Sequence, residues 1–413
     1  MNIFLGVYAC EPNNGSEPEV GWQMVNQIAK LLPNDNIYAL TKKNNKEKIE
    51  AVEYQKNINF IYYEPPKWLT FWKKGGRGIR TYYYLWSIGA ALHMKKQKIN
   101  FDIIHHITFV NDWMPSFYFL LKTKNSKFIW GPNGSNDPID FKFLDNRKLK
   151  LQEIITNSLK LFFRNIDPFF QICKSKADCI IGINKNVKHK LSLTNKRFIS
   201  EPAIAIKEED IENKAYVQNI KDEEFIIISV GRLVHIKNFK LTLLSFAKFL
   251  ENNKHITNVK LQIIGNGPEE KKLIELTKEL GIETSVVFTG KISLDEVQDK
   301  FSQANLFLFP TLENAGFVTI EAMAKSLPVL AMKYGGPEQF VISNRDKQLV
   351  DSTLSYDELI QDFSEKMKYF YTNPSLCEEI GNQNKLVILN NFTWEAKAKK
   401  MVDLYKELLN EKN

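Results

Sequence analysis

The chain has 413 residues, of which 44% are hydrophobic and 25% are charged, and its formal net charge is +8. This length exceeds what one hydrophobic core usually supports, so we expect two domains of roughly 200 residues each. No run of about 18 apolar residues occurs, which argues against a membrane-spanning helix. The four cysteines form neither a CxxC pair nor a zinc-ligand pattern. The positive charge favours an anionic partner: a nucleic acid, a membrane surface or a phosphorylated substrate.

Short apolar runs alternate with helical patterns in the first half of the chain. Helical stretches such as Glu19–Leu32 and Ser116–Lys122 separate the strands. The first apolar run has no basic segment ahead of it, so we interpret it as a strand and not as a signal peptide. The expected strands are Asn2–Tyr8, Asn36–Thr41, Asn59–Tyr63, Asp102–His106, Phe128–Trp130 and Cys179–Ile183.

The same alternation restarts near Phe225. The expected strands are Phe225–Val230, Val259–Ile264, Val286–Thr289, Leu306–Phe309 and Val329–Ala331. The expected helices are Phe239–Leu250, Pro268–Leu280, Leu294–Ser302, with a capping box at Ser293 and Glu296, and Thr319–Ala324. Continuous apolar strands between helices indicate an α/β protein with two doubly wound parallel sheets. We expect a first domain over residues 1–200 and a second over 201–393, with the boundary between Glu201 and about Glu224.

The loop after the first strand, Glu11–Trp22, contains Gly15 and Ser16. It is a flexible turn that leads into a helix at the carboxyl edge of a sheet, where ligands of such sheets bind. We expect it to close over phosphates from the opposite domain. The alternative is an ordinary strand–helix loop.

Two basic side chains follow the strand Phe225–Val230. Arg232 and Lys237 lie five positions apart just after its end, beside Gly231, so both cations can converge on one anion. A diphosphate leaving group needs such cations, because negative charge develops on its bridging oxygen as the bond to that oxygen breaks. The alternative is two charges on a solvated loop. Gly265 and Gly267 follow the next strand, in a turn that can be purely architectural.

Two carboxylates, Glu313 and Glu321, lie eight positions apart across a loop and a helix start, with Gly316 between them. A carboxylate can accept hydrogen bonds from two adjacent hydroxyls, so one can hold a sugar and the other a ribose. Gly335 and Gly336 follow, and they can present backbone N–H groups to a phosphate. The alternative is two unrelated surface acids.

Together these segments resemble the family-4 retaining glycosyltransferases with the GT-B fold, the glycosyl transferases group 1. The resemblance covers the whole chain and is strongest from Val230 to Gly336. It implies two Rossmann-like domains that face each other across a cleft, the first binding the acceptor and the second the sugar nucleotide, with the helix at about 394–413 packed on the first. It implies that Arg232 and Lys237 bind the diphosphate, that Glu313 contacts the donor sugar and that Glu321 contacts the ribose.

The resemblance thus implies a set of site residues. The catalytic residues are Arg232, Lys237 and Glu313. The substrate-binding residues are Gly15, Ser16, Gly231, Gly267, Asn314, Ala315, Gly316, Phe317, Val318 and Glu321.

Three segments depart from the family pattern. The first loop has one glycine, Gly15, where the family has two, and Asn314–Phe317 replaces a commoner Gly-Phe-Gly. Many relatives place a histidine where this chain has Trp130–Ser135. The acceptor-side candidates are therefore His105, His106 and Asn133, although a histidine at a strand end is often a packed residue.

The resemblance implies transfer with retention of anomeric configuration, in which the leaving phosphate helps to deprotonate the acceptor hydroxyl, and closure of the domains over the site. No Asp-x-Asp follows a strand, so we expect no metal and no cofactor; Arg232, Lys237 and loop amides replace the metal's charge.

The acceptor side is interpreted from Lys67–Phe101, which has eight basic residues, no acidic residue and seven clustered aromatics, and from Leu159–Arg164 with Phe169 and Phe170. Basic and aromatic side chains together suit an anionic membrane surface. The alternatives are a buried aromatic core beneath a solvated helix, or single-stranded nucleic acid, which we do not expect because no RNA-binding signature is present.

We therefore expect a cytoplasmic enzyme, peripheral on the inner face of the cell membrane. It transfers a sugar from a UDP- or GDP-sugar to a hydroxyl of a glycan or lipid-linked acceptor, in cell-surface polysaccharide or lipopolysaccharide synthesis. The alternatives are a sugar-nucleotide epimerase on the same fold and a catalytically silent protein that binds nucleotide sugars.

Overall fold

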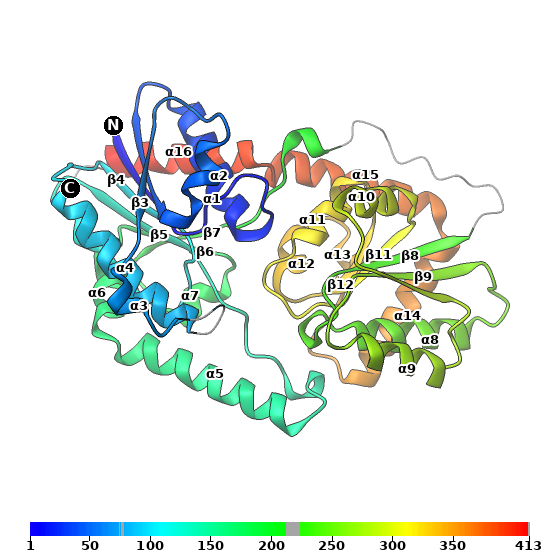
Figure 1. Cartoon of the computed structure of the whole chain (residues 1–413). Coiled ribbons are helices and arrows are strands. Elements are labelled where there is room, and N and C mark those ends of the chain that lie inside the picture. Colours follow the sequence, from blue (N-terminus) through cyan, green and yellow to red (C-terminus); the bar gives the residue numbers. More distant parts are fainter. Residues whose placement is uncertain (74, 76–77, 212–223, 412–413) are drawn as a thin grey trace. The chain divides into compact units, whose positions relative to one another are not determined.

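A computed structural model of the chain describes residues 1–73, 75, 78–211 and 224–411 (Figure 1). The chain forms two compact units, each with a parallel sheet covered by helices, so the predicted α/β class is confirmed. Part of the predicted boundary stretch, residues 212–223, lies outside the described residues. Unit 1 comprises Met1–Ser135, Ile154–Ala205 and Trp394–Asn413, and unit 2 comprises Asn136–Glu153 and Ile206–Thr393.

Unit 1 is built on a parallel sheet with the strand order β3-β2-β1-β4-β5-β6-β7. Its strands are β1 (Asn2–Val7), β2 (Asn36–Lys42), β3 (Ile58–Tyr63), β4 (Ile103–Thr108), β5 (Lys127–Asn133), β6 (Cys179–Gly182) and β7 (Arg197–Ser200). Its helices are α1 (Ser16–Leu31), α2 (Lys46–Glu50), α3 (Lys67–Thr70), α4 (Ile79–Lys96), α6 (Pro168–Lys176), α7 (Asn186–Lys190) and α16 (Trp394–Asn410), with the 3₁₀ turns η1 (Lys43–Asn45) and η2 (Phe117–Leu121). Helix α5 (Arg147–Ile166) begins in unit 2 and ends in unit 1.

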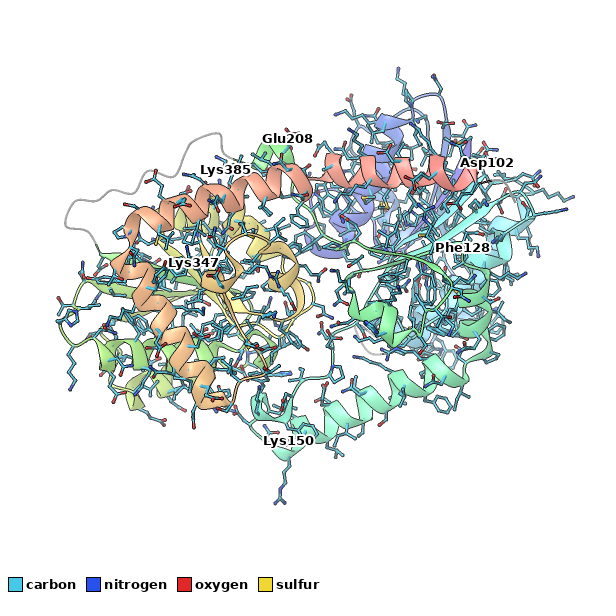
Figure 2. All side chains as sticks on the ribbon, turned by 180° about the vertical axis from the view of Figure 1, so that it is seen from behind. Asp102, Phe128, Lys150, Glu208, Lys347 and Lys385 are labelled. Carbon is cyan, nitrogen blue, oxygen red and sulfur yellow. The ribbon has the colours of Figure 1, made fainter. Side chains whose placement is uncertain are left out.

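Aromatic rings fill much of the interior of unit 1. Phe4 of β1 contacts Tyr118 at 4.9 Å between ring centroids, and Trp86 of α4 is fully buried. Figure 2 shows Phe128 in β5 and Asp102 just ahead of β4, where the Asp102 carboxylate accepts the backbone N–H of Asn2 at 2.7 Å. Burial of these large rings supplies a major part of the hydrophobic stabilisation of this unit.

The basic and aromatic stretch Lys67–Phe101 divides between the interior and the surface. Tyr83 and Trp86 are buried in the core, whereas Trp68 and Phe71 are 72% and 79% exposed. The alternative that the aromatic rings form a buried core therefore holds for Tyr83 and Trp86 of α4. The exposed rings of Trp68 and Phe71 lie on and beside α3.

Unit 2 is built on a parallel sheet with the strand order β10-β9-β8-β11-β12-β13. Helices α8, α9 and α14 cover one face, and α10, α11 and α15 cover the other (Figure 1). Its strands are β8 (Phe225–Val230), β9 (Val259–Ile264), β10 (Val286–Gly290), β11 (Leu306–Phe309), β12 (Val329–Met332) and β13 (Leu349–Val350). Its helices are α8 (Phe239–Asn252), α9 (Glu270–Glu279), α10 (Leu294–Gln303), α11 (Phe317–Ala324), α12 (Gly335–Phe340), α13 (Arg345–Gln348), α14 (Tyr356–Thr372) and α15 (Pro374–Asn391), with the 3₁₀ turns η3 (Phe141–Phe143), η4 (Glu208–Asp210) and η5 (His235–Lys237).

The predicted bounds of β8, β9 and β11 coincide with those in the structure, because each strand is an apolar run between polar loops. The capping box is confirmed: Ser293 Oγ accepts the Glu296 N–H at 3.2 Å, and the Glu296 carboxylate accepts the Ser293 N–H at 2.8 Å. The predicted helix at Ser116–Lys122 is the shorter 3₁₀ turn η2. Strands β7 and β13 were not predicted, because β7 is a partly exposed edge strand and β13 has only two residues.

Candidate functional site

The strand order places a switch point between β8 and β11 in unit 2. The chain runs from β8 outward to β9 and β10, and then returns to the other side of β8 to form β11. Ligands of open parallel sheets bind outside the carboxyl ends of the strands at such a point. The loop after β8 carries Arg232 and Lys237, and the loop after β11 carries Glu313. The structure brings Lys237 and Glu313 together, and Arg232 lies exposed on the loop after β8.

The two loops are joined directly. The Leu312 N–H donates to the Ile236 carbonyl at 2.8 Å, and the Thr311 hydroxyl donates to the same carbonyl at 3.3 Å. Lys237 Nζ lies 2.5 Å from Glu313 Oε2, and their side chains are 15% and 23% exposed. This partly shielded ion pair offers a ligand one cation and one anion. A bound ligand can pair with Lys237 through an anionic group and with Glu313 through hydrogen-bond donors.

Lys237 is positioned by its neighbours as well as by its charge. Its Nζ lies 5.0 Å from the centre of the Phe309 ring, in a cation–π contact. A Cβ atom on Gly231 would lie 3.5 Å from Lys237 Cε, and Gly231 has φ +155°, a backbone conformation that favours glycine. Arg232, the next residue, is exposed. Gly231 therefore allows the chain to turn after β8 so that Lys237 lies across the end of the strand.

Glu321 lies on α11 and is partly buried. Burial and the nearby Asp210 carboxylate raise the pKa of Glu321, and Lys237 acts in the opposite direction. Such a carboxylate gains from hydroxyl donors, because they replace the water that burial removed.

The segment between the two glutamates forms the start of α11. Asn314 is buried and its N–H donates to Asn136 Oδ1 at 3.2 Å, whereas Ala315 is exposed. Gly316 caps the helix with φ +157°, and Phe317 and Val318 in the first turn are partly buried. These residues follow Glu313 directly in the chain, so they form the continuation of the loop that carries the Lys237–Glu313 pair.

Gly335 and Gly336 pack closely against the loop that carries Glu313, and the phosphate contact suggested by the sequence stays a prediction. The Gly336 N–H donates to the Glu313 carbonyl at 3.0 Å. A Cβ atom would lie 2.1 Å from the Glu313 carbonyl oxygen at Gly335, and 1.7 Å from the Ala315 carbonyl oxygen at Gly336. Only glycine lets the two backbone segments approach so closely, and this contact fixes the loop that carries Glu313.

Gly267 has a similar packing role between the loops after β8 and β9. A Cβ atom there would lie 2.3 Å from the Leu233 carbonyl oxygen, and the Leu233 N–H donates to the Asn266 carbonyl at 2.9 Å. The turn after β9 thus packs against the loop that carries Arg232 and Lys237.

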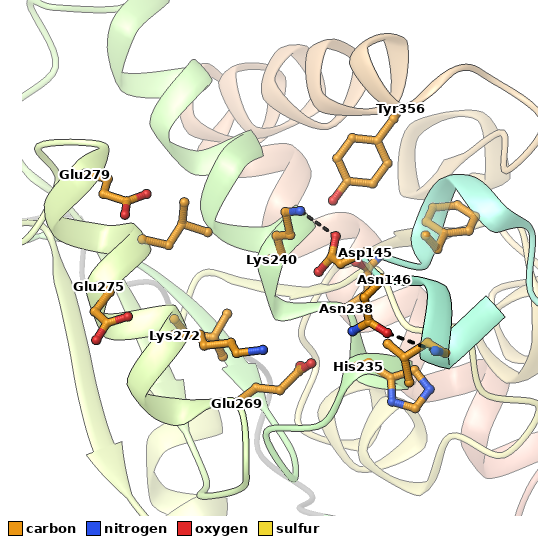
Figure 3. Close-up of a pocket in the computed structure, with 14 residues that line it drawn as sticks. Asp145, Asn146, His235, Asn238, Lys240, Glu269, Lys272, Glu275, Glu279 and Tyr356 are labelled. Atoms are coloured by element: carbon orange, nitrogen blue, oxygen red, sulfur yellow. Dashed lines mark hydrogen bonds and ion pairs between the residues drawn. The ribbon is translucent and has the colours of Figure 1, made fainter. Parts of the chain in front are cut away.

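A cavity of about 300 Å³ lies next to the Lys237 loop, between α8, α9 and residues 143–149 (Figure 3). Lys240 Nζ pairs with Asp145 Oδ1 at 2.6 Å in its wall. Burial raises the pKa of Glu269, and His235, which also lines the cavity, lowers it. The sequence reasoning missed these residues, although His235 and Asn238 flank the predicted Lys237.

The unit 1 sheet has its own switch point, between β1 and β4. Gly15 precedes α1 there with φ +25°, is exposed, and has no atom within 4 Å of an added Cβ. Ser16 begins α1, and its side chain lies outside the described part of the structure.

The structure places the three acceptor-side candidates in the interior of unit 1. His105 Nδ1 lies 2.6 Å from the Tyr405 hydroxyl and Nε2 lies 2.8 Å from the Gly131 carbonyl, and burial lowers the His105 pKa to about 4. His106 Nε2 lies 2.7 Å from the Tyr83 hydroxyl, and burial lowers its pKa to about 3. Asn133 is fully buried and its side chain donates to the Trp130 carbonyl at 2.8 Å. In this arrangement both histidines are buried, hydrogen-bonded residues of the core, as the alternative interpretation of the sequence holds.

Two charged residues at this edge were not singled out from the sequence. The Glu17 carboxylate accepts the Phe109 N–H, and burial raises the Glu17 pKa while that hydrogen bond and Arg80 lower it. The guanidinium carbon of Arg80 lies 5.1 Å from the centre of the Phe109 ring. Both residues could have been found from their positions in the sequence, because Glu17 follows Gly15 in the first loop and Arg80 lies in the basic and aromatic stretch Lys67–Phe101.

Neither metal-binding clusters nor membrane spans were found within the described residues. No group of three or more His, Cys, Asp or Glu side chains there could hold a metal ion. Among the same residues, no helix is long and apolar enough to cross a bilayer.

Comparison with known proteins gives a match in unit 2 and a fold for the whole chain. Residues 210–387 match the family "Glycosyl transferases group 1". The chain is 33% identical over 133 residues to the alpha-monoglucosyldiacylglycerol synthase of Streptococcus pneumoniae, covering 32% of this chain and 29% of that protein. It is 25% identical over 199 residues to the lipopolysaccharide 1,2-N-acetylglucosaminetransferase of Salmonella typhimurium, covering 46% and 50%. The chain thus spans half the length or less of these curated relatives.

The solved structure of sucrose-phosphate synthase from Thermosynechococcus elongatus is similar along the whole of both chains. Its TM-score is 0.65 at 17% identity, and the match covers 100% of this chain and 100% of that chain. This likeness shows the fold, which is GT-B with two Rossmann-like domains.

Proposed function

We propose that this chain, whose residues 210–387 match the glycosyl transferases group 1, is a glycosyltransferase that uses a nucleotide sugar as donor. The observation that carries the proposal is the Lys237–Glu313 pair at the switch point of unit 2, inside the matched segment. The acceptor is a hydroxyl of a glycan or of a lipid-linked glycan. The names of the two curated relatives, a glycolipid synthase and a lipopolysaccharide sugar transferase, support a role in cell-surface glycan synthesis.

The donor would bind by exchange of partners at the ion pair. Lys237 turns from Glu313 to the diphosphate, and Arg232, exposed on the same loop, adds a second positive charge. Glu313, released from Lys237, accepts hydrogen bonds from the donor sugar. Glu321 accepts two ribose hydroxyls, which suits a carboxylate that burial has partly desolvated.

The reaction would retain the anomeric configuration and need no metal ion. The bond between the anomeric carbon and the phosphate oxygen breaks, and its electron pair stays on the diphosphate. The acceptor oxygen forms the new bond on the same face and passes its proton to the departing phosphate oxygen. Lys237 and Arg232 stabilise the charge that develops on that oxygen, in place of a divalent cation.

A product analysis tests this function. The chain is incubated with UDP- and GDP-sugars and a panel of glycan and glycolipid acceptors, with and without EDTA, and the products are examined by NMR. The proposal expects nucleotide release coupled to a glycoside with the donor's anomeric configuration, at equal rates with EDTA. A free isomerised nucleotide sugar formed without acceptor would identify an epimerase. Donor binding without turnover on any acceptor would identify a silent binding protein, and either result contradicts the proposal.

We extend the proposal to an anionic membrane surface as the site of action, on the inner face of the cell membrane. The exposed Trp68 and Phe71 beside lysines of the α3 segment support it, as do the 60% exposed Leu161 and 52% exposed Phe162 of α5. The double variant Trp68→Ser, Phe71→Ser should lose co-sedimentation with phosphatidylglycerol vesicles. A control, Leu294→Ser, removes a 76% exposed side chain in unit 2 and should not. Equal binding of the double variant and wild type would refute this extension.

A further inference from the structure

A second cavity, of about 420 Å³, lies in unit 1 between α4, α5 and residues 113–114. Its volume falls within the range of about 300–1,000 Å³ that small-molecule sites occupy. Among the described residues, its lining contains two cations and no carboxylate, and most of its surface is apolar. The apolar side chains are Leu85, Trp113, Met114, Leu159 and Phe163.

The walls of this cavity are held in place by a buried ion pair. Asp112 is fully buried, and its carboxylate accepts from Arg164 Nη2 of α5 at 2.8 Å, while its carbonyl accepts from Arg164 Nε at 2.8 Å. The ring centroids of Trp113 and Phe163 lie 5.9 Å apart at the same junction, with the ring planes tilted by 46°. Because α5 is fixed to the loop after β4, the cavity is preformed.

Arg80 lines the cavity and connects it to the switch point of unit 1. Its guanidinium carbon lies 5.1 Å from the centre of the Phe109 ring and 5.7 Å from that of Trp113, and the residue is exposed. The Phe109 N–H donates to Glu17, in the first turn of α1 after Gly15. A continuous set of contacts therefore leads from the predicted Gly15 loop to the cavity.

We propose that this cavity binds the alkyl chain of an anionic amphiphile, and that Arg80 pairs with a phosphate at the head of that chain. The occupant follows from the chemistry: an apolar interior accepts hydrocarbon, and the exposed guanidinium at its edge, with Lys160 and no acid in the lining, selects an anion. The amphiphile is the acceptor, held by its tail while its head reaches the sheet edge. This assignment rests on the proposed function, since it names the class of acceptor.

The proposal predicts a dependence on chain length. Each methylene that moves from water into the cavity should strengthen binding up to about fourfold, and the gain should stop once the cavity is full. Loss of the charge-assisted contact to Arg80 should weaken binding of the phosphate roughly tenfold or more.

Titration calorimetry of the full chain with octyl and decyl phosphate tests this directly, with decyl glucoside and inorganic phosphate as comparisons. Decyl phosphate should bind more tightly than octyl phosphate and than decyl glucoside, and inorganic phosphate, which lacks the alkyl chain, should bind far more weakly than either alkyl phosphate. Arg80→Gln should remove the preference for phosphate over glucoside and keep the dependence on chain length. Binding that is independent of chain length, or inorganic phosphate that binds as tightly as decyl phosphate, overturns the proposal.

A matched pair of α5 variants locates the site. Leu159→Trp fills the cavity from a position that is 51% exposed, and should weaken decyl phosphate binding at least tenfold. Ile154→Trp adds the same ring at a 49% exposed position on the same helix outside the lining, and should change binding less than twofold. Equal effects of the two variants overturn the assignment of the cavity.

The two proposals fail in different ways. Sugar transfer to an acceptor without binding of decyl phosphate refutes the cavity assignment alone. Chain-length-dependent binding of decyl phosphate, lost in Leu159→Trp, together with no transfer from any nucleotide sugar, supports the cavity and refutes the proposed reaction.

Discussion

Replacing Lys237 with alanine removes the cation that joins the loops after β8 and β11. Its Nζ lies 2.5 Å from Glu313 Oε2 and 5.0 Å from the centre of the Phe309 ring, and the side chain is only 15% exposed. Removing one preorganised group that stabilises developing negative charge typically costs roughly 2.7–4 kcal/mol in the transition state. We therefore expect kcat to fall roughly 10²- to 10³-fold. KM for the donor should rise as well, because Lys237 also pairs with the diphosphate of the bound donor, and the further charge on the leaving oxygen makes the fall in kcat the larger effect.

The assay is the initial rate of nucleotide release in the presence of acceptor, at several donor concentrations. Lys240→Ala is the control, because Lys240 also forms an ion pair, at 2.6 Å to Asp145, but its side chain is 45% exposed. Exposed pairs contribute little, about 0–1 kcal/mol, so this variant should keep kcat within about twofold. A Lys237→Ala enzyme with wild-type kcat refutes the reasoning, and so does an equal loss in both variants.

Three further outcomes follow from the structure. Because burial and Asp210 raise the pKa of Glu321 above its ordinary value of 4.5, its charged form opposes folding at higher pH. Glu321→Gln should therefore raise the midpoint of thermal unfolding at pH 8, and this gain should shrink as the pH falls toward 4.5. An equal gain at both pH values contradicts the reasoning. The same substitution should weaken nucleotide-sugar binding about tenfold. Gly336→Ala places a Cβ 1.7 Å from the Ala315 carbonyl oxygen, so urea unfolding should show a loss of about 1–3 kcal/mol and donor titration a lower affinity. The His105 pKa falls from 6.5 to about 4 on folding, so protonation should cost roughly 3 kcal/mol of stability as the pH falls from 6.5 to 4. Unfolding of His105→Gln at pH 7 and pH 4.5 should show a smaller acid sensitivity than wild type, and an unchanged one would contradict the assignment.

The contact between Lys237 and Glu313 could be predicted because both residues follow apolar strands. Lys237 and Glu313 are 76 positions apart, yet each lies just after a strand whose hydrophobic run is unmistakable. A doubly wound sheet then brings those strand ends together. Local pattern and fold class were enough to place these two side chains near each other, whereas their roles toward a donor come from the family resemblance and stay predictions.

The packing contact of the paired glycines could not be predicted from the same information. Gly335 and Gly336 are adjacent to a helix start, which favours phosphate binding on local grounds. Their actual partners are the carbonyls of Glu313 and Ala315, more than twenty positions earlier, and only the packing of two loops determines that contact.

The burial of His105 could likewise not be predicted from the local sequence pattern. Its ring contacts Tyr405, 300 positions later in α16, so burial of the imidazole depends on a helix from the other end of the chain. Arg80 illustrates the same limit, because its contact with Phe109 joins α4 to the end of β4.

The most direct test of the donor site is thermal unfolding of the full chain with UDP, GDP and their sugar conjugates. A nucleotide at a hundred times its dissociation constant stabilises the folded state by about 2.7 kcal/mol. The account predicts that nucleotides of one base raise the midpoint of the wild-type chain, and that this shift is lost in the double variant Arg232→Ala, Lys237→Ala. A wild-type midpoint that no nucleotide changes, or an equal shift in the double variant, would contradict a diphosphate site at Arg232 and Lys237.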